Sequence, residues 1–202
     1  MAGSTSRLKH WWERVRTRDP YWDDFLHRPP ADPRNIVTPA ILKAPGGSVF
    51  LNLTDIHDPA AMSGHVKEAA KFFGSDATGI AALPQVGGPH PNPPPEGEGA
   101  KYQFAIVCLV AAVEEVQDSA GIGGQFALQI CAIANFNVAS YIRELGYAAT
   151  VTTEDAHTYA AAAGLGRLDS DGRLVTREYG RKVGLAGAVL TNIPLVADTP
   201  SP

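Results

Sequence analysis

The side chains best suited to acid–base chemistry lie close together between residues 154 and 159. They are Glu154, Asp155, His157 and Tyr159. Carboxylates next to a histidine change its proton affinity, and a neutral imidazole is also a common metal ligand. We therefore predict these four as candidate catalytic residues, with His157 as the candidate metal ligand. The competing interpretation is an exposed first helical turn, in which acidic side chains stabilise the helix N-terminus.

A glycine-rich strap follows this cluster, and we use that name for residues 163–195. It contains Ala-Gly-Leu-Gly at 163–166, Gly-Arg-Leu-Val-Thr at 172–176 and Glu-Tyr-Gly at 178–180, and it closes on Leu-Thr-Asn-Ile-Pro-Leu at 190–195. Glycine turns on either side of an apolar strand let the backbone approach a ligand closely. The pattern predicts a surface that lies flat against a large planar ligand.

Composition and motifs limit the other options. The 202 residues suit one domain, and 17 basic against 21 acidic residues give a formal net charge of -4. No segment collects a basic stripe, so we expect no nucleic-acid surface. Neither a phosphate-binding glycine loop nor a Gly-x-Ser-x-Gly elbow occurs. The two cysteines, Cys108 and Cys131, lie in apolar runs and are expected to be buried thiols rather than a disulfide or a metal site.

The elements that must position these residues form a mixed pattern. We expect helices over 58–73, 122–145 and 155–163, and strands over 77–83, 103–113, 147–152, 173–176 and 184–191. The apolar run at 103–113 is typical of a central strand covered on both faces. Thr152 and Asp155 have the spacing of a capping box, and Arg143 marks the solvated end of the long helix. The prediction is an α+β (layered α/β) fold whose sheet is covered by helices on both faces.

Residues 1–45 are expected to form an extended arm before a globular domain of residues 46–202. All three tryptophans lie in this proline-broken arm. Their rings must be buried against the same domain or against a second subunit, so a homodimer or a partner subunit is expected. Residues 87–99, rich in proline, are expected to be a solvated connector or a substrate lid. Without a signal-peptide core or a long apolar run, the chain is predicted to be cytoplasmic and to contact no membrane.

The motifs also occur in a particular order. Val-Ala-Ser-Tyr-Ile-Arg-Glu-Leu-Gly-Tyr-Ala-Ala at 138–149 precedes the motifs of the strap, and segments at 66–74, 78–81 and 101–107 precede both. This order resembles the corrinoid-binding core of reductive dehalogenases and, more distantly, of epoxyqueuosine reductase. In that family the corresponding segments are, in chain order, Leu-Gly-Tyr, Ala-Gly-Leu-Gly, an apolar strand, Pro-Glu-Tyr/Phe-Gly and Thr-Asp-Leu-Pro-Leu. The resemblance covers about residues 60 to 195.

The resemblance implies a nitroreductase-like fold that holds a cobalamin. It assigns the corrin contacts to the strap, where apolar side chains meet the ring and small residues let backbone N–H groups approach its amides. The cofactor-binding residues implied in this way are Leu165, Gly166, Leu174, Val175, Thr176, Tyr179 and Gly180.

The chain also departs from the family. The dehalogenases continue into a module with two cysteine-rich iron–sulfur motifs, whereas this chain ends at Pro202 with two cysteines in total. The family's catalytic Arg or Lys after Glu-Tyr-Gly is replaced by Gly184, and its catalytic Tyr has no clear counterpart. The Gly-Asn-Asp segment before the strap is replaced by residues 151–155. We therefore expect no reductive dehalogenation.

Two classes of function follow from this resemblance. The first is a corrinoid-dependent oxidoreductase or transferase, or a subunit of one, that acts on a small molecule with electrons from an external reductase. The second is a non-catalytic cobalamin carrier or an assembly subunit. A haem or a flavin in the same pocket is a further alternative, with His157 as the axial ligand of the haem.

Overall fold

A five-stranded antiparallel sheet forms the centre of the molecule. The computed structural model describes residues 37–44, 46–83, 102–113, 115–116 and 122–200. Four strands run in the order β1 (Ala77–Ala82), β2 (Phe104–Ala111), β7 (Ala188–Thr191) and β3 (Ala149–Thr152), and the short β6 (Val183–Gly184) also pairs with β2. The predicted α+β class is confirmed.

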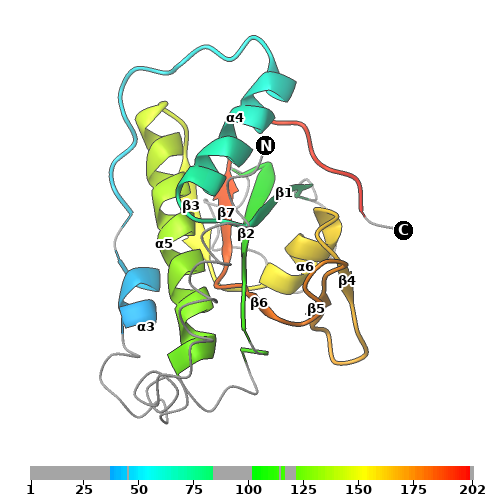
Figure 1. The fold of residues 1–202 in the computed structure, drawn as a ribbon. Helices are drawn as coiled ribbons and strands as arrows, with labels where there is room; N and C mark the ends of the chain where they lie inside the picture. Colours follow the sequence, from blue (N-terminus) through cyan, green and yellow to red (C-terminus); the bar gives the residue numbers. More distant parts are fainter. Residues whose placement is uncertain (1–36, 45, 84–101, 114, 117–121, 201–202) are drawn as a thin grey trace.

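Helices cover both faces of this sheet. Helices α4 (Pro59–Phe72) and α5 (Ile122–Glu144) pack on one face, and α6 (Ala156–Ala162) packs on the other (Figure 1). The side chains of β2 alternate between the two faces, as the pleat of a strand requires. Ile106, Cys108 and Val110 join the core under α4 and α5, whereas Ala105, Val107 and Leu109 join the core under α6.

The predicted boundaries of the first helix are confirmed by its caps. Asp58 is the N-cap of α4, and its Oδ1 accepts hydrogen bonds from the backbone N–H groups of Ala60 (2.9 Å) and Ala61 (3.1 Å). Pro59 occupies the first position of the helix, where no N–H is needed. Gly74 follows the C-terminus with a φ of 109°, a conformation that glycine adopts at low cost.

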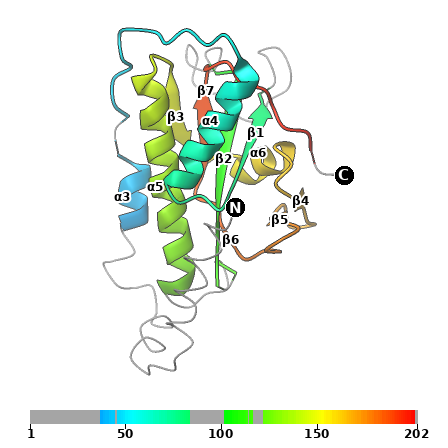
Figure 2. The same ribbon diagram turned by 45° about the horizontal axis from the view of Figure 1, so that its top comes forward.

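The strap divides into two parts in the structure. Its first part forms a small hairpin of β4 (Arg167–Leu168) and β5 (Leu174–Val175), which lies beside α6 and apart from the main sheet (Figure 2). Its second part enters the main sheet as β6 and β7. The single strand predicted over 184–191 is wrong, because Gly187 breaks it with a φ of 144°.

Two local predictions at helix ends are also wrong. Asp155 precedes α6 in the left-handed region (φ 53°) and makes no capping hydrogen bond, while the Thr152 hydroxyl accepts from the N–H of Glu154 at 3.1 Å. Arg143 is 5% exposed and not solvated, because its guanidinium donates to the carbonyl of Ala149 (3.0 Å) and to the hydroxyl of Ser140 (2.9 Å).

Several predictions fall outside the described residues, including most of the arm (1–36) and the loop at 87–99. Within the range predicted as an extended arm, Val37–Leu42 forms the helix α3, which packs against α5. Across the described part of the chain, no helix combines the length and the hydropathy that a membrane crossing requires.

Candidate functional site

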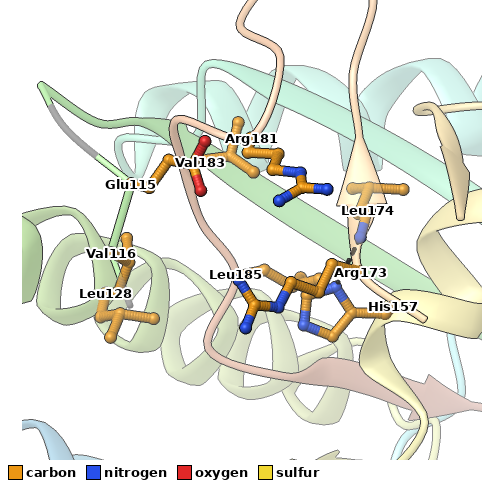
Figure 3. Close-up of a pocket in the computed structure, with 9 residues that line it drawn as sticks. All are labelled: Glu115, Val116, Leu128, His157, Arg173, Leu174, Arg181, Val183 and Leu185. Carbon is orange, nitrogen blue, oxygen red and sulfur yellow. Dashed lines mark hydrogen bonds between the residues drawn. The ribbon is translucent and has the colours of Figure 1, made fainter. Parts of the chain in front are cut away.

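A small pocket opens between the first turns of α5, strand β6 and the β4–β5 hairpin. Its volume is about 170 Å³. The aliphatic part of its wall consists of Val116, Leu128, Leu174, Val183 and Leu185, and the polar part consists of Glu115, His157, Arg173 and Arg181 (Figure 3). A volume of this size suits a ligand smaller than the drug-sized molecules that occupy pockets of about 300–1,000 Å³.

His157 reaches this pocket from α6 in a fixed orientation. Its Nδ1 accepts a hydrogen bond from the backbone N–H of Leu174 at 3.1 Å. Burial lowers the pKa of His157, and the positive charge of Arg173 lowers it further, so the ring is neutral near pH 7. Because Nδ1 is the acceptor, the proton of the neutral ring is on Nε2. In this tautomer His157 is a hydrogen-bond donor and offers no free lone pair to a metal.

The other three predicted catalytic residues do not line the pocket. Glu154 is exposed, and Asp155 and Tyr159 lie half-buried beside it at the start of α6. Burial raises the pKa of Tyr159, and the carboxylates of Asp155 and Glu154 raise it further. The predicted cluster therefore separates into His157, which faces the pocket, and a group of three residues outside it.

Two arginines of the pocket were not predicted as functional. Arg181 forms an ion pair with Asp169, with 2.6 Å between Nη2 and Oδ2. Asp169 is itself held by the backbone N–H groups of Asp171 (2.8 Å) and Arg173 (3.0 Å), which lower its carboxyl pKa together with the charge of Arg181. The Asp-Ser-Asp-Gly-Arg sequence at 169–173 is the signal for this turn. The convergence of both arginines on one pocket depends on the fold.

Several strap residues predicted to bind a cofactor pack against the protein core. Leu174 is 2% exposed in the core under α6, and Leu165 packs against Gly79 of β1. A Cβ on Gly166 would lie 2.5 Å from the carbonyl oxygen of Val175, so this glycine allows close contact within the hairpin. Thr176 is buried and bonds through its hydroxyl to the carbonyl of Gly180 at 3.1 Å. These residues support the strap from the side that faces the protein core.

The remaining predicted strap residues are partly exposed. Val175 and Tyr179 are half-buried, and a Cβ on Gly180 would meet no atom within 4 Å. Gly180 has a φ of 59°, which closes the tight turn back to Thr176. Burial and the neighbouring charges of Glu178 and Asp76 raise the pKa of Tyr179 to about 12, so its phenol keeps its proton at neutral pH.

Position 184, where the resemblance places the family's catalytic cation, is tightly packed. Gly184 lies in β6 against the backbone of α5, where an added Cβ would come within 2.4 Å of the carbonyl carbon of Ala127. A side chain therefore cannot be accommodated at position 184 without displacing α5. Glycine at position 184 is required by this packing.

The cysteines behave as predicted. Cys108 and Cys131 are free and buried in the core between α5 and the sheet. Burial raises the pKa of Cys108 to about 12 and the pKa of Cys131 further still, so both remain thiols. Within the described residues, no group of three His, Cys, Asp or Glu side chains is placed to hold a metal ion.

No family model matches the sequence, and neither does any curated protein. Solved structures do match the fold. A variant of the catabolic reductive dehalogenase NpRdhA matches with a TM-score of 0.65 and 25% identity, over 83% of this chain and 25% of that one. A reductive dehalogenase whose structure suggests a mechanism for B12-dependent dehalogenation matches with a TM-score of 0.61 and 24% identity, over 83% and 24%. Epoxyqueuosine reductase from Bacillus subtilis matches with a TM-score of 0.52 and 16% identity, over 69% and 47%.

The chain has a reductive dehalogenase-like fold. The suspected relationship is therefore confirmed at the level of the fold. The reductive dehalogenase-like fold of this chain spans about a quarter of the length of the dehalogenases that it matches. The greater part of those enzymes has no counterpart in the alignment, so their activity does not follow from the shared fold.

Proposed function

We propose that this chain is a corrinoid-binding redox protein, or a subunit of one, with a nitroreductase-like sheet and no dehalogenase activity. The observation that supports this most strongly is the fold match to reductive dehalogenases, at a TM-score of 0.65 over 83% of the chain. The strap motifs that resemble the corrinoid-binding core lie within this fold. The proposal includes a small-molecule substrate and an external electron donor.

The described residues fit one wall of such a cofactor site. The pocket of about 170 Å³ is too small to enclose a corrin macrocycle. The strap has free space at Gly180, however, because no described atom lies within 4 Å of a Cβ added there. Val175, Tyr179 and Gly180 would contact the ring from this surface, while Leu165, Gly166, Leu174 and Thr176 support them from behind. A bound corrinoid would supply cobalt redox or group-transfer chemistry.

The geometry of His157 argues against the haem alternative. An axial ligand must offer a ring-nitrogen lone pair. The Nδ1 lone pair already accepts the N–H of Leu174, and Nε2 carries the proton in that tautomer. Ligation through Nε2 would therefore require the loss of this hydrogen bond. For the same reason we no longer favour His157 as a cobalt ligand, and we propose it as a hydrogen-bond donor at the pocket.

The proposal includes an electron donor outside the described residues. An iron–sulfur cluster needs four cysteines, and the two described thiols are buried in the core. A homodimer or a complex through residues 1–45 remains part of the proposal. A non-catalytic cobalamin carrier is the second candidate, favoured by the closed packing at Gly184.

The test is a binding assay with two matched variants. Purified protein is mixed with hydroxocobalamin, passed through gel filtration, and examined by its absorption spectrum. We expect corrin bands to stay with the protein at a ratio near one to one, and haemin or flavin added in parallel to be lost. Gly180→Trp should abolish this retention because it fills the open surface of the strap.

The control for this assay is Gly172→Trp. Gly172 also has a positive φ (73°) and open space around its Cβ position, so the backbone strain is matched, but it lies at the tip of the hairpin outside the proposed contact. Retention of cobalamin by Gly172→Trp with loss in Gly180→Trp supports the proposal. A wild-type protein that retains no corrinoid, or retains haem instead, overturns it.

A further inference from the structure

The pocket combines one polar side with one aliphatic side. Val116, Leu128, Val183 and Leu185 form a small apolar wall, and Arg173, Arg181 and His157 place hydrogen-bond donors on the other wall. Figure 3 shows the Arg173 side chain beside the His157 ring, with Arg181 across the pocket from them. Such an arrangement suits a ligand with a charged head and a compact apolar body.

Arg173 has hydrogen-bonding capacity that the described part of the chain does not use. No carboxylate among the described residues forms an ion pair with its guanidinium. A guanidinium has five N–H donors in a planar fork that matches a carboxylate with two parallel hydrogen bonds. The backbone N–H of Arg173 is fixed by Asp169 at 3.0 Å, so the arginine is anchored at its base. It is therefore placed to receive an anion.

Arg181 is held in position by a separate interaction. Asp169 occupies one edge of its guanidinium through the 2.6 Å contact, and the side chain of Asp169 is only 14% exposed. This ion pair neutralises much of the Arg181 charge and fixes its direction, while the remaining N–H groups are available to a ligand. Because it is oriented before binding, Arg181 loses little conformational freedom when a ligand arrives.

His157 and Glu115 set the charge that the pocket accepts. His157 adds a neutral Nε2–H donor, because its Nδ1 accepts from Leu174. Glu115 adds one negative charge on the same pocket wall. Arg181 is paired with Asp169, whereas Arg173 has no ion-pair partner among the described residues, so the pocket offers one unpaired guanidinium, which matches one negative charge better than the two charges of a phosphate dianion. A single negative charge on an organic body is the better match.

We propose that this pocket binds a small organic monocarboxylate, with its carboxylate on Arg173, Arg181 and the His157 Nε2–H and its aliphatic body against Val183, Leu185 and Leu128. The proposal is independent of corrinoid binding. It would remain valid if the strap bound no cofactor. It would fail if the pocket bound charged and uncharged ligands equally well, and that result would leave the corrinoid proposal unaffected.

The test compares two ligands that differ by one charge. Pentanoate and pentanamide have nearly the same shape, and their affinities for the full chain are measured by NMR titration. We expect pentanoate to bind at least tenfold more tightly than pentanamide. Inorganic phosphate is the third probe and should bind more weakly than pentanoate, because it lacks the apolar body and adds a second charge.

Three variants assign the effect to the pocket. Arg173→Gln should weaken pentanoate binding at least tenfold, and Glu115→Gln should strengthen it several-fold by removing the opposing charge. Arg177→Gln is the matched control, since Arg177 is an exposed arginine of the strap that does not line the pocket. It should change the affinity less than twofold.

The outcomes decide the proposal in both directions. Charge discrimination with loss in Arg173→Gln and gain in Glu115→Gln supports it, and the gain cannot arise from misfolding. Equal binding of pentanoate and pentanamide overturns it. Tighter binding of phosphate than of pentanoate also overturns it, as does an Arg173→Gln variant with wild-type affinity.

Discussion

His157 connects the chemistry of the pocket to the stability of the fold. Its ring is half-buried, its Nδ1 accepts from Leu174 at 3.1 Å, and Arg173 and Asp169 are the nearest charged groups acting on it. Arg181 and Glu115 line the same pocket from the other elements packed around it. Burial and Arg173 lower the pKa, whereas Asp169 acts in the opposite direction. The folded protein therefore binds a proton at His157 less readily than the unfolded chain does.

This shift predicts how stability depends on pH. Above the ordinary pKa of 6.5 neither state is protonated at this residue, so the stabilisation is fully present. As pH falls through 6.5 the unfolded chain takes up the proton first, and the free energy of unfolding decreases until the folded ring is protonated too. Urea unfolding of wild type and His157→Gln between pH 8 and pH 5 should show this decrease in wild type and its loss in the variant.

The control for the pH series is His65→Gln. His65 is exposed on α4 and far in sequence from the pocket residues, so its replacement should leave the wild-type pH dependence in place. A His157→Gln variant with the same pH dependence as wild type would contradict the account of the ring as a buried, neutral hydrogen-bond acceptor.

At the level of single residues, the sequence drew attention to His157, which lines the pocket, and to the glycine at position 184. It did not predict Arg173 and Arg181, because their function depends on the hairpin and β6 meeting at one pocket. Nor did it indicate that Leu174 and Gly166 pack inward, since the sequence pattern of a ligand-facing strap and of a core-facing hairpin is the same. Whether a strap side chain faces a ligand or the core is decided by the tertiary fold.

At the level of elements, the packing of β6 against α5 explains why position 184 holds a glycine. Val183 and Gly184 pair with Ala111 and Val110 of β2, which holds Gly184 against the backbone of Ala127. The close approach leaves no room for a Cβ at 2.4 Å from the carbonyl carbon of Ala127. Overpacking of this kind costs about 1–3 kcal/mol or more, because two backbones must separate.

Replacement of this glycine tests the packing directly. Gly184→Ala should lower the free energy of unfolding by about 1–3 kcal/mol, measured by urea denaturation. Gly64→Ala is the matched control, because Gly64 lies in the exposed interior of α4 with no atom within 4 Å of its Cβ position. Alanine there should stabilise the protein by about 0.5–1 kcal/mol through helix propensity.

The two glycine variants must therefore differ in sign. If Gly184→Ala is as stable as wild type, the space beside Ala127 is larger than the structure indicates. In that case Gly184→Lys would also be tolerated, and the family's cation could be restored at this position.

The helices and long strands were predictable because their signals are local. Asp58 and Pro59 mark the start of α4, and the burial of β2 on both faces follows from its continuous apolar sequence. The β4–β5 hairpin was only half predicted, since β4 consists of two residues whose pairing depends on partners six and eight residues away. The break at Gly187 was missed because a strand and a strand–turn–strand have the same apolar composition.

At the scale of the whole molecule, the chain shares its fold with reductive dehalogenases, but their activity does not follow from this fold. The ordered motifs predicted a reductive dehalogenase-like fold, and the solved structures confirm this with a TM-score of 0.65. The shared fold covers about a quarter of the length of those enzymes, so their reaction does not follow from it. The described residues place a partly exposed strap surface next to a small charged pocket.

The most direct test of the corrinoid proposal is hydrogen exchange with and without hydroxocobalamin, followed by peptide-level mass spectrometry. We predict protection of peptides from residues 173–182, which carry Val175, Tyr179 and Gly180. Helix α4 packs on the opposite face of the sheet and should exchange at the same rate in both samples. Protection confined to other parts of the chain, or an exchange pattern that hydroxocobalamin leaves unchanged, would contradict the account.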